Sequence, residues 1–235
     1  FRSWEVTGTA GRLATPDDII DCGNSGIILR FFMGLAACCD GYSILSGDHS
    51  LRHIRLCQPL IDALNGLGAW AASTKGDGHA PVIVRGPLRG GQVEIDGLDS
   101  QPVSALLIAT SIAEAPSDII VRRPGETPWV GVTLDWLTRC GVDFSNDRFQ
   151  RYRVRGHGRW DAFETQIPLD WSAALYPLTA AVLTPDSEVH LPGLDPDDSQ
   201  GDKDVVRILR EMGADIEVRD DEVVARSSRL TGREI

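Results

Sequence analysis

The chain has 235 residues, of which 42% are hydrophobic and 24% are charged. This composition is that of an ordinary globular protein and excludes the disordered and fibrous classes. Acidic residues outnumber basic ones by 34 to 23, so the formal net charge is -11, and no run rich in Lys and Arg is interleaved with aromatic residues. The sequence therefore excludes nucleic acid as a partner.

The cysteines and the apolar stretches predict a cytoplasmic protein without disulfides. Five cysteines, an odd number with no C-x-x-C pair, favour free thiols in a reducing compartment. The longest apolar stretch, 27–39, is interrupted by Arg30 and is too short to span a bilayer. No charged leader precedes it, and we expect no membrane association. The chain starts at Phe1 and ends at Ile235 as though cut from a longer protein.

The first distinctive stretch is DCGNSGIILRF at 21–31, in which a strand end, a tight turn and an apolar helix follow one another. Small residues at the helix start leave backbone N–H groups open, and these groups attract anions together with the helix dipole. Lys75 and Lys203 are the only lysines. An anionic ligand therefore has to be bound by arginine or by backbone N–H groups.

One pattern of helix, strand, helix and hairpin occurs three times along the chain, with a repeat of about 60 residues. Each copy contains a helix, a strand, a second helix that ends at Gly and continues into a strand, and a final hairpin strand. These segments lie at 25–39, 42–47, 58–73 and 81–86 in the first copy, at 101–113, 118–123, 132–146 and 151–156 in the second, and at 172–183, 188–193, 204–218 and 222–227 in the third.

The repeat predicts an α/β fold with mixed sheets. Helices that alternate with strands imply parallel pairs through crossover connections, and the hairpins add antiparallel pairs. The stretch WDAFETQIPLDW at 160–171 has no hairpin signal and is the expected domain crossing. We expect one domain at 1–166 and a second at 167–235, in which the lone third copy leaves a sheet edge or a helix face uncovered.

Several motifs that agree in order along nearly the whole chain resemble those of one family. They are VTGTAGRL (6–13), CGNSG (22–26), GDHSLRHIR (47–55), LDSQPVSAL (98–106), PLDWSAAL (168–175) and DDSQGDKDVVRILREMGADI (197–216). Together they resemble the enolpyruvyl transferase family, and within it the 5-enolpyruvylshikimate-3-phosphate synthases. The resemblance implies βαβαββ units in inside-out, barrel-like α/β lobes. Residues 1–166 would be most of an N-terminal lobe with an incomplete first unit, and 167–235 the first unit of a C-terminal lobe.

The same resemblance implies an activity. It is the transfer of the enolpyruvyl group of phosphoenolpyruvate to the 5-hydroxyl of shikimate 3-phosphate, with release of phosphate, in the shikimate pathway of aromatic amino acid biosynthesis. It implies no metal or organic cofactor, these two small molecules as partners, and a monomer when the protein is complete. The family's acid/base carboxylate, a lysine and further arginines lie in segments that this chain lacks. We therefore expect the chain alone to bind ligand without turnover.

The resemblance also implies a binding site for phosphoenolpyruvate. Its residues are Asn24, Gly26, Arg55 and Gln101. Gly26, without a side chain, would let the ligand approach the backbone. Arg55 keeps the spacing of the family's arginine to the glycine that ends the next helix, although Leu56 replaces the usual Pro and Arg52 remains an alternative. Arg30, one turn after Gly26, is expected to anchor the helix.

The implied site for shikimate 3-phosphate departs from the family pattern. Its residues are Asp99, Ser100, Gln101, Glu126 and Trp129. Asp99 and Glu126 stand where the family has phosphate-holding serines, and Trp129 stands where it has a tyrosine. A phosphate beside two carboxylates meets a repulsion of several kcal/mol, even at an effective dielectric constant of about 20.

Several interpretations of the two acids remain open. Arg122 and Arg123 could offset the repulsion, or Asp99 and Glu126 could bind these arginines in the empty site. The acceptor could instead carry no phosphate, so that the acids bind hydroxyl groups, or Asp99 could simply cap the helix that starts at Gln101. The alternatives to the family activity are therefore an enolpyruvyl transferase with a non-phosphorylated acceptor, or a ligand-binding remnant without catalysis.

Neither histidine nor cysteine predicts a further site. His49 and His53 have the i, i+4 spacing of a metal pair, but no third ligand follows at motif spacing. Cys57 and Cys140 fall on apolar helix faces, where a buried thiol is more common than a nucleophile. We therefore expect no bound metal and no cysteine nucleophile.

Overall fold

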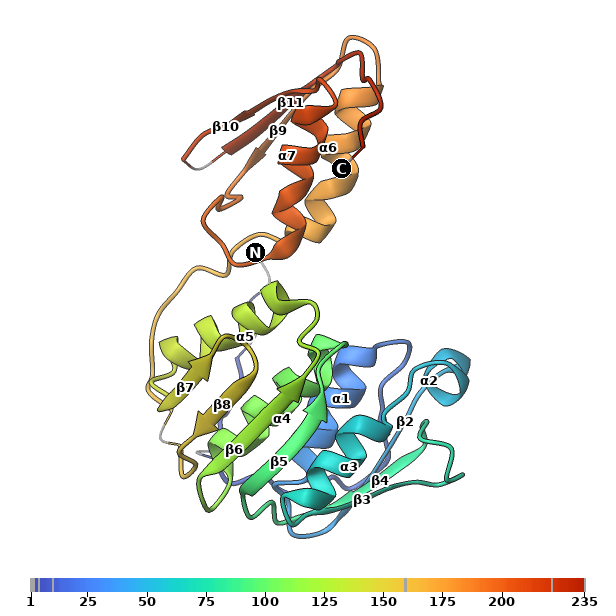
Figure 1. Ribbon diagram of the computed structural model, residues 1–235, viewed down its shortest axis with the longest axis vertical. Coiled ribbons are helices and arrows are strands. Elements are labelled where there is room, and N and C mark those ends of the chain that lie inside the picture. Colours follow the sequence, from blue (N-terminus) through green and yellow to red (C-terminus); the bar gives the residue numbers. More distant parts are fainter. Residues whose placement is uncertain (1–2, 4, 10, 159, 221, 235) are drawn as a thin grey trace. The chain divides into compact units, whose positions relative to one another are not determined.

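A computed structural model describes residues 3, 5–9, 11–158, 160–220 and 222–234 of the chain (Figure 1). They divide into two compact units, Phe1–Phe163 and Glu164–Ile235. The division falls inside the 160–171 stretch, and the assignment of the units to two lobes of a larger protein stays a prediction. In the described residues, no helix is both long enough and apolar enough to cross a membrane.

The first unit contains two four-stranded sheets with helices between them (Figure 1). Its elements are β1 (Ile20–Asp21), α1 (Gly26–Ala36), β2 (Tyr42–Ser46), α2 (His49–His53), α3 (Gln58–Gly66), β3 (Trp70–Ser73), β4 (Val82–Arg85), β5 (Gly91–Asp96), α4 (Ser100–Ile112), β6 (Ser117–Arg122), α5 (Thr127–Arg139), β7 (Phe144–Asp147) and β8 (Arg151–Val154). Helix α3 contacts β3 of one sheet and β5 of the other, and α1 packs against α4. Both sheets and these helices share one hydrophobic core.

The two sheets have the same strand arrangement. In the first, β1 pairs in parallel with β2, β2 pairs antiparallel with β4, and β4 pairs antiparallel with β3. In the second, β5, β6, β8 and β7 take the same places. Each sheet therefore joins one crossover pair to one hairpin, and the predicted α/β class with repeated mixed sheets is confirmed.

Helices α1 and α4 each begin at a side chain that caps them. Ser25 Oγ accepts a hydrogen bond from the backbone N–H of Ile28 at 3.2 Å, and Asp99 Oδ1 accepts one from the backbone N–H of Gln101 at 2.9 Å. A cap of this kind contributes about 1 kcal/mol to stability. The capping interpretation of Asp99 is therefore confirmed.

Gly34 allows α1 and α4 to lie close together. A Cβ atom on Gly34 would lie 2.8 Å from the backbone oxygen of Ala105 and 3.3 Å from the Cβ of Ala109. No real Cβ atom tolerates the first distance, so glycine is required at this crossing. Because the helices run side by side, the start of α1 at Gly26 lies next to the start of α4 at Gln101.

The second unit contains one copy of the repeat. Its elements are α6 (Trp171–Leu183), β9 (Glu188–Pro192), the 3₁₀ turn η1 (Gly201–Asp204), α7 (Val205–Glu211), β10 (Asp215–Val218) and β11 (Glu222–Arg226). The strand order β9-β11-β10 is that of the other sheets without the first, parallel strand. Tyr176 and Leu183 of α6 are 79% and 62% exposed, so the lone copy leaves a helix face uncovered, as expected.

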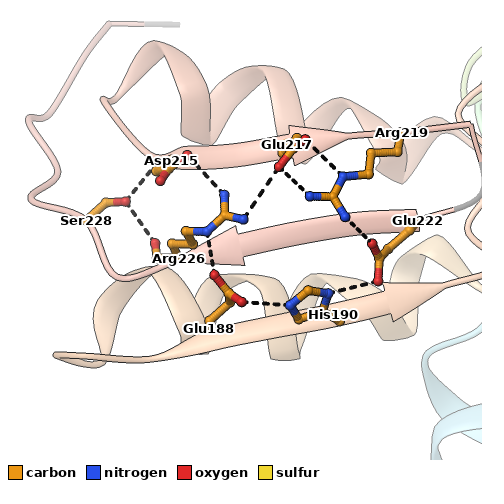
Figure 2. A network of polar contacts seen from close by, with 8 residues as sticks. All are labelled: Glu188, His190, Asp215, Glu217, Arg219, Glu222, Arg226 and Ser228. Atoms are coloured by element: carbon orange, nitrogen blue, oxygen red, sulfur yellow. Dashed lines mark hydrogen bonds and ion pairs between the residues drawn. The ribbon is translucent and has the colours of Figure 1, made fainter.

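The sheet of the second unit carries a closed ring of charged side chains on one face (Figure 2). Successive contacts of 2.5–3.5 Å link Glu188, Arg226, Glu217, Arg219, Glu222 and His190, which returns to Glu188. Val223 and Ala225 belong to the core on the other face, because strand side chains alternate. Val224 points to the ring side and is nevertheless 0% exposed, so the ring covers it.

Candidate functional site

The candidate site lies in the first unit, where the N-termini of α1 and α4 meet. A Cβ atom on Gly26 would lie 2.7 Å from Arg30 Nη1 and 3.1 Å from Gln101 Oε1. It would lie 3.7 Å from Arg55 Nη1. The structure therefore brings together three residues expected to bind phosphoenolpyruvate, and it adds Arg30 to them.

Arg30 is the buried charge of the site, with 3% of its surface exposed. Its Nη1 donates to Gln101 Oε1 at 2.8 Å. Its Nη2 donates to the backbone oxygen of Leu56 at 3.1 Å and pairs with Asp99 Oδ2 at 2.9 Å. These contacts anchor α1 to α4 and to the segment before α3, as expected for Arg30, but they also place its guanidinium among the predicted ligand-binding residues.

The geometry favours Arg55 over Arg52 as the arginine beside Gly26. Arg55 lies just after α2, and its guanidinium approaches Gly26 as described above. Arg52 lies within α2, and its charge acts on Asp48. Ligand binding by Arg55 itself stays a prediction.

Asn24 contacts the N-cap residue of α2 and not the residues around Gly26. Its Nδ2 donates to Asp48 Oδ2 at 2.6 Å, and Asp48 Oδ1 caps α2 by accepting from the backbone N–H of Leu51 at 3.1 Å. The hydrogen bond from Asn24 is the main reason why the pKa of Asp48 lies below its ordinary value. Asn24 therefore connects the turn before α1 to the first turn of α2.

Glu126 occupies the N-terminus of α4. It precedes α5 with a φ of 47°, in the left-handed region. Its Oε2 accepts hydrogen bonds from the backbone N–H of Ser100 at 3.1 Å and from Ser100 Oγ at 2.8 Å. Two donors at the start of α4 are therefore satisfied by a carboxylate of the chain itself.

Arg122 and Arg123 are not bound by Asp99 or Glu126, so the interpretation in which these acids bind them in the empty site is wrong. Arg122 forms an ion pair with Glu94, and Arg123 forms one with Asp96. Glu94 and Asp96 belong to β5, which pairs in parallel with β6. The neighbouring strand therefore supplies both arginines with acidic partners.

Trp129 lies in the first turn of α5 and is half-buried. Its backbone N–H donates to the backbone oxygen of Glu126 at 3.0 Å, so Trp129 and Glu126 belong to the same loop-to-helix junction. In the described part of the chain its indole makes no hydrogen bond. Stacking of the indole on a substrate ring stays a prediction.

Sequence reasoning missed two contacts of this site. Gly26 and Arg30 are i and i+4 on one helix and therefore share a face, which is a signal that places Arg30 beside the helix start. The contact between Glu126 and Ser100 spans 26 residues and depends on a left-handed backbone at Glu126. No local sequence pattern predicts such a contact.

The residues around Gly26 have the chemistry of an anion-binding site. Arg55 and the N-terminus of α1 supply positive charge and N–H donors, while Arg30 is paired with Asp99 and supports Gln101. In the described residues, no group of three or more His, Cys, Asp or Glu could hold a metal ion, and His49 and His53 stack with ring centroids 4.3 Å apart. Burial raises the pKa of the Cys57 thiol to about 11, which opposes a role as nucleophile.

Comparison with known sequences places the chain in one family. Residues 2–235 match the family described as EPSP synthase (3-phosphoshikimate 1-carboxyvinyltransferase). The chain is 40% identical over 230 residues to the 3-phosphoshikimate 1-carboxyvinyltransferase of Acetivibrio thermocellus, covering 98% of this chain and 54% of that protein. It is 41% identical over 237 residues to that of Methanothrix thermoacetophila, covering 99% and 55%. The chain thus spans about half the length of the curated relatives it matches.

Solved structures share the fold. An EPSP synthase from Acinetobacter baumannii superposes with a TM-score of 0.74 and 24% identity, covering 94% of this chain and 51% of that one. The enolpyruvyl transferase NikO from Streptomyces tendae superposes with a TM-score of 0.59 and 18% identity, covering 80% and 44%. Since the family match extends over almost every residue, the chain belongs to the EPSP synthase (3-phosphoshikimate 1-carboxyvinyltransferase) family.

Proposed function

We propose that the protein to which this chain belongs transfers the enolpyruvyl group of phosphoenolpyruvate to the 5-hydroxyl of shikimate 3-phosphate and releases phosphate. The observation that carries the proposal is the convergence of Arg30, Arg55 and Gln101 on Gly26 at the start of α1. Phosphoenolpyruvate carries a phosphate and a carboxylate, which are the groups that arginines and helix N-termini bind best. Family membership supplies the reaction.

In this proposal the chain contributes binding and charge stabilisation. Arg55 and the N–H groups of α1 hold phosphoenolpyruvate, and Gln101 donates to both substrates. Ser100 and Trp129 line the acceptor side. Protonation of C3 of phosphoenolpyruvate and attack of the 5-hydroxyl on C2 give a tetrahedral intermediate, which loses phosphate and a proton from C3. These proton transfers need an acid/base group from the other half of the protein. The chain alone therefore binds without turnover, and the complete protein is a cytoplasmic monomer of two lobes.

The direct test is a calorimetric titration of the chain with phosphoenolpyruvate. Arg55→Ala removes the charge beside Gly26 and is expected to weaken binding about tenfold or more. Arg52→Ala is the matched control, because it removes an arginine three residues away that lies within α2 and not beside Gly26. Equal effects of the two substitutions, or no binding by the unaltered chain, would contradict the proposed site.

A second candidate is the same transfer to an acceptor that carries no phosphate. The observation in its favour is Glu126, whose carboxylate already satisfies Ser100 at the start of α4. A substrate phosphate at this position has to displace one carboxylate while Asp99 remains close by. Parallel titrations with shikimate 3-phosphate and with shikimate separate the candidates: tighter binding of the phosphorylated ligand supports the first, and tighter binding of shikimate supports the second.

A further inference from the structure

The side chain of Gln101 has a defined orientation. Its Oε1 accepts a hydrogen bond from Arg30 Nη1 at 2.8 Å. A guanidinium group has donors only, so the amide oxygen of Gln101 has to face Arg30 and the amide nitrogen has to face away. In the described residues Gln101 Nε2 makes no hydrogen bond, which leaves its two N–H groups for a ligand.

Arg30 is itself held from several directions. Its two terminal nitrogens contact Gln101 and Asp99 of the α4 start and Leu56 of the segment before α3. The side chain is almost fully buried, and a planar fork with bonds to three acceptors has little freedom to rotate. Arg30 is therefore a rigid support for the Gln101 amide.

Asp99 acts on the same glutamine through a second route. Its Oδ1 accepts from the backbone N–H of Gln101 at 2.9 Å, while its Oδ2 pairs with Arg30 at 2.9 Å. Arg30 and Asp99 thus hold the Gln101 side chain and backbone respectively. A carboxylate at position 99 repels a phosphate. In this arrangement the Asp99 carboxylate neutralises the buried guanidinium of Arg30.

We propose that Arg30 is a positioning residue, which turns the amide oxygen of Gln101 inward so that the amide N–H groups are presented to an anionic substrate. The proposal rests on the proposed function, in which Gln101 is a ligand-binding residue. It adds a residue that reaches the substrate only through Gln101, together with Asp99 as the partner that holds Arg30 in place.

The test uses the ¹⁵N-labelled chain and reads the side-chain amide of Gln101 by NMR relaxation. Its signal is identified by its absence in Gln101→Glu. Arg30→Lys keeps the positive charge but has a single nitrogen, which cannot reach Gln101 and Asp99 in the same way. Asp99→Asn keeps a helix cap and removes the charged partner of Arg30. Arg52→Lys is the matched control.

We expect a restrained Gln101 amide in the unaltered chain and in Arg52→Lys, and a mobile one in Arg30→Lys, with phosphoenolpyruvate binding about tenfold weaker in the latter. A smaller increase in mobility is expected for Asp99→Asn, which decides the question if Arg30→Lys does not fold. An amide that is equally mobile in the unaltered chain and in the variants overturns the proposal. If the unaltered chain does not bind phosphoenolpyruvate, the proposed function fails, while the relaxation data still decide the position of Gln101.

Discussion

Glu126 and Ser100 are joined by two hydrogen bonds, in which one carboxylate oxygen accepts from both the N–H and the hydroxyl of the serine. The pair closes the N-terminus of α4 with an anion that belongs to the chain. A helix N-terminus is a natural site for a substrate anion, so this contact bears directly on which acceptor the site takes.

Removal of the carboxylate should open this position to phosphate. We expect Glu126→Ser to bind shikimate 3-phosphate about tenfold more tightly than the unaltered chain, because one repulsive charge is lost and two donors are released. Titration calorimetry of both chains measures the difference. Glu114→Ser, at an exposed position away from the site, should leave the affinity unchanged. Equal affinities in the unaltered chain and Glu126→Ser would show that Glu126 does not control access.

Gly26 should be intolerant of a side chain. A Cβ at this position would lie 2.7 Å from Arg30 Nη1, so Gly26→Ala has to displace a buried guanidinium, and crowding of this kind costs about 1–3 kcal/mol. Urea unfolding followed at the α1 amides measures the loss. Gly8→Ala is the control, because nothing lies within 4 Å of its Cβ position. A stabilised Gly26→Ala chain, as helix propensity alone predicts, would show that Arg30 moves without cost.

His190 should make the stability of the second unit depend on pH. Its Nδ1 and Nε2 lie 2.9 Å from Glu222 and 2.7 Å from Glu188, and only the protonated ring donates from both nitrogens. The hydrogen bond to Glu188, followed by that to Glu222, raises the pKa of His190 above its ordinary value of 6.5. The stabilisation by protonated His190 is therefore complete below pH 6.5 and is lost as the pH rises through the raised pKa of His190.

The measurement for His190 is denaturant unfolding of the second unit on either side of this pH range. His190→Gln should reduce the loss of unfolding free energy that the second unit shows as the pH rises. His53→Gln, in the first unit, should leave this loss unchanged. The carboxylates of Glu188 and Glu222 have lowered pKa values, mainly through His190, so their contribution has the opposite sign and is lost on acidification. If the same loss of unfolding free energy persists in His190→Gln, groups other than His190 cause the pH dependence.

The buried thiols should resist alkylation in the folded chain. Burial raises the pKa of Cys22 and Cys57 to about 11 and that of the half-buried Cys38 to about 12. A shift from 9.0 to about 11 lowers the thiolate fraction about a hundredfold. Iodoacetamide labelling followed by mass spectrometry should therefore proceed far more slowly in buffer than in urea. Rapid labelling of Cys57 in the native chain would contradict its burial beside Arg30.

The sequence by itself determined the repeated helix, strand, helix and hairpin pattern and the α/β class, and it offered the cap at Asp99 as one interpretation that the structure confirms. These features depend on residues that are neighbours in the chain, since helical spacing, strand alternation and capping act over a few positions. The motifs also led to Gly26, Arg55 and Gln101, which the structure brings together.

Only the tertiary structure decided which charged side chains pair with one another. Arg122 and Arg123 pair with the adjacent strand and not with the acids of the site, whereas Arg30 reaches Gln101 over 71 residues of sequence. Such pairings follow from the register of β5 with β6 and from the close approach of α1 to α4 at Gly34. Charges interact through space and not along the chain, so their partners are defined only once the sheets and helices have packed.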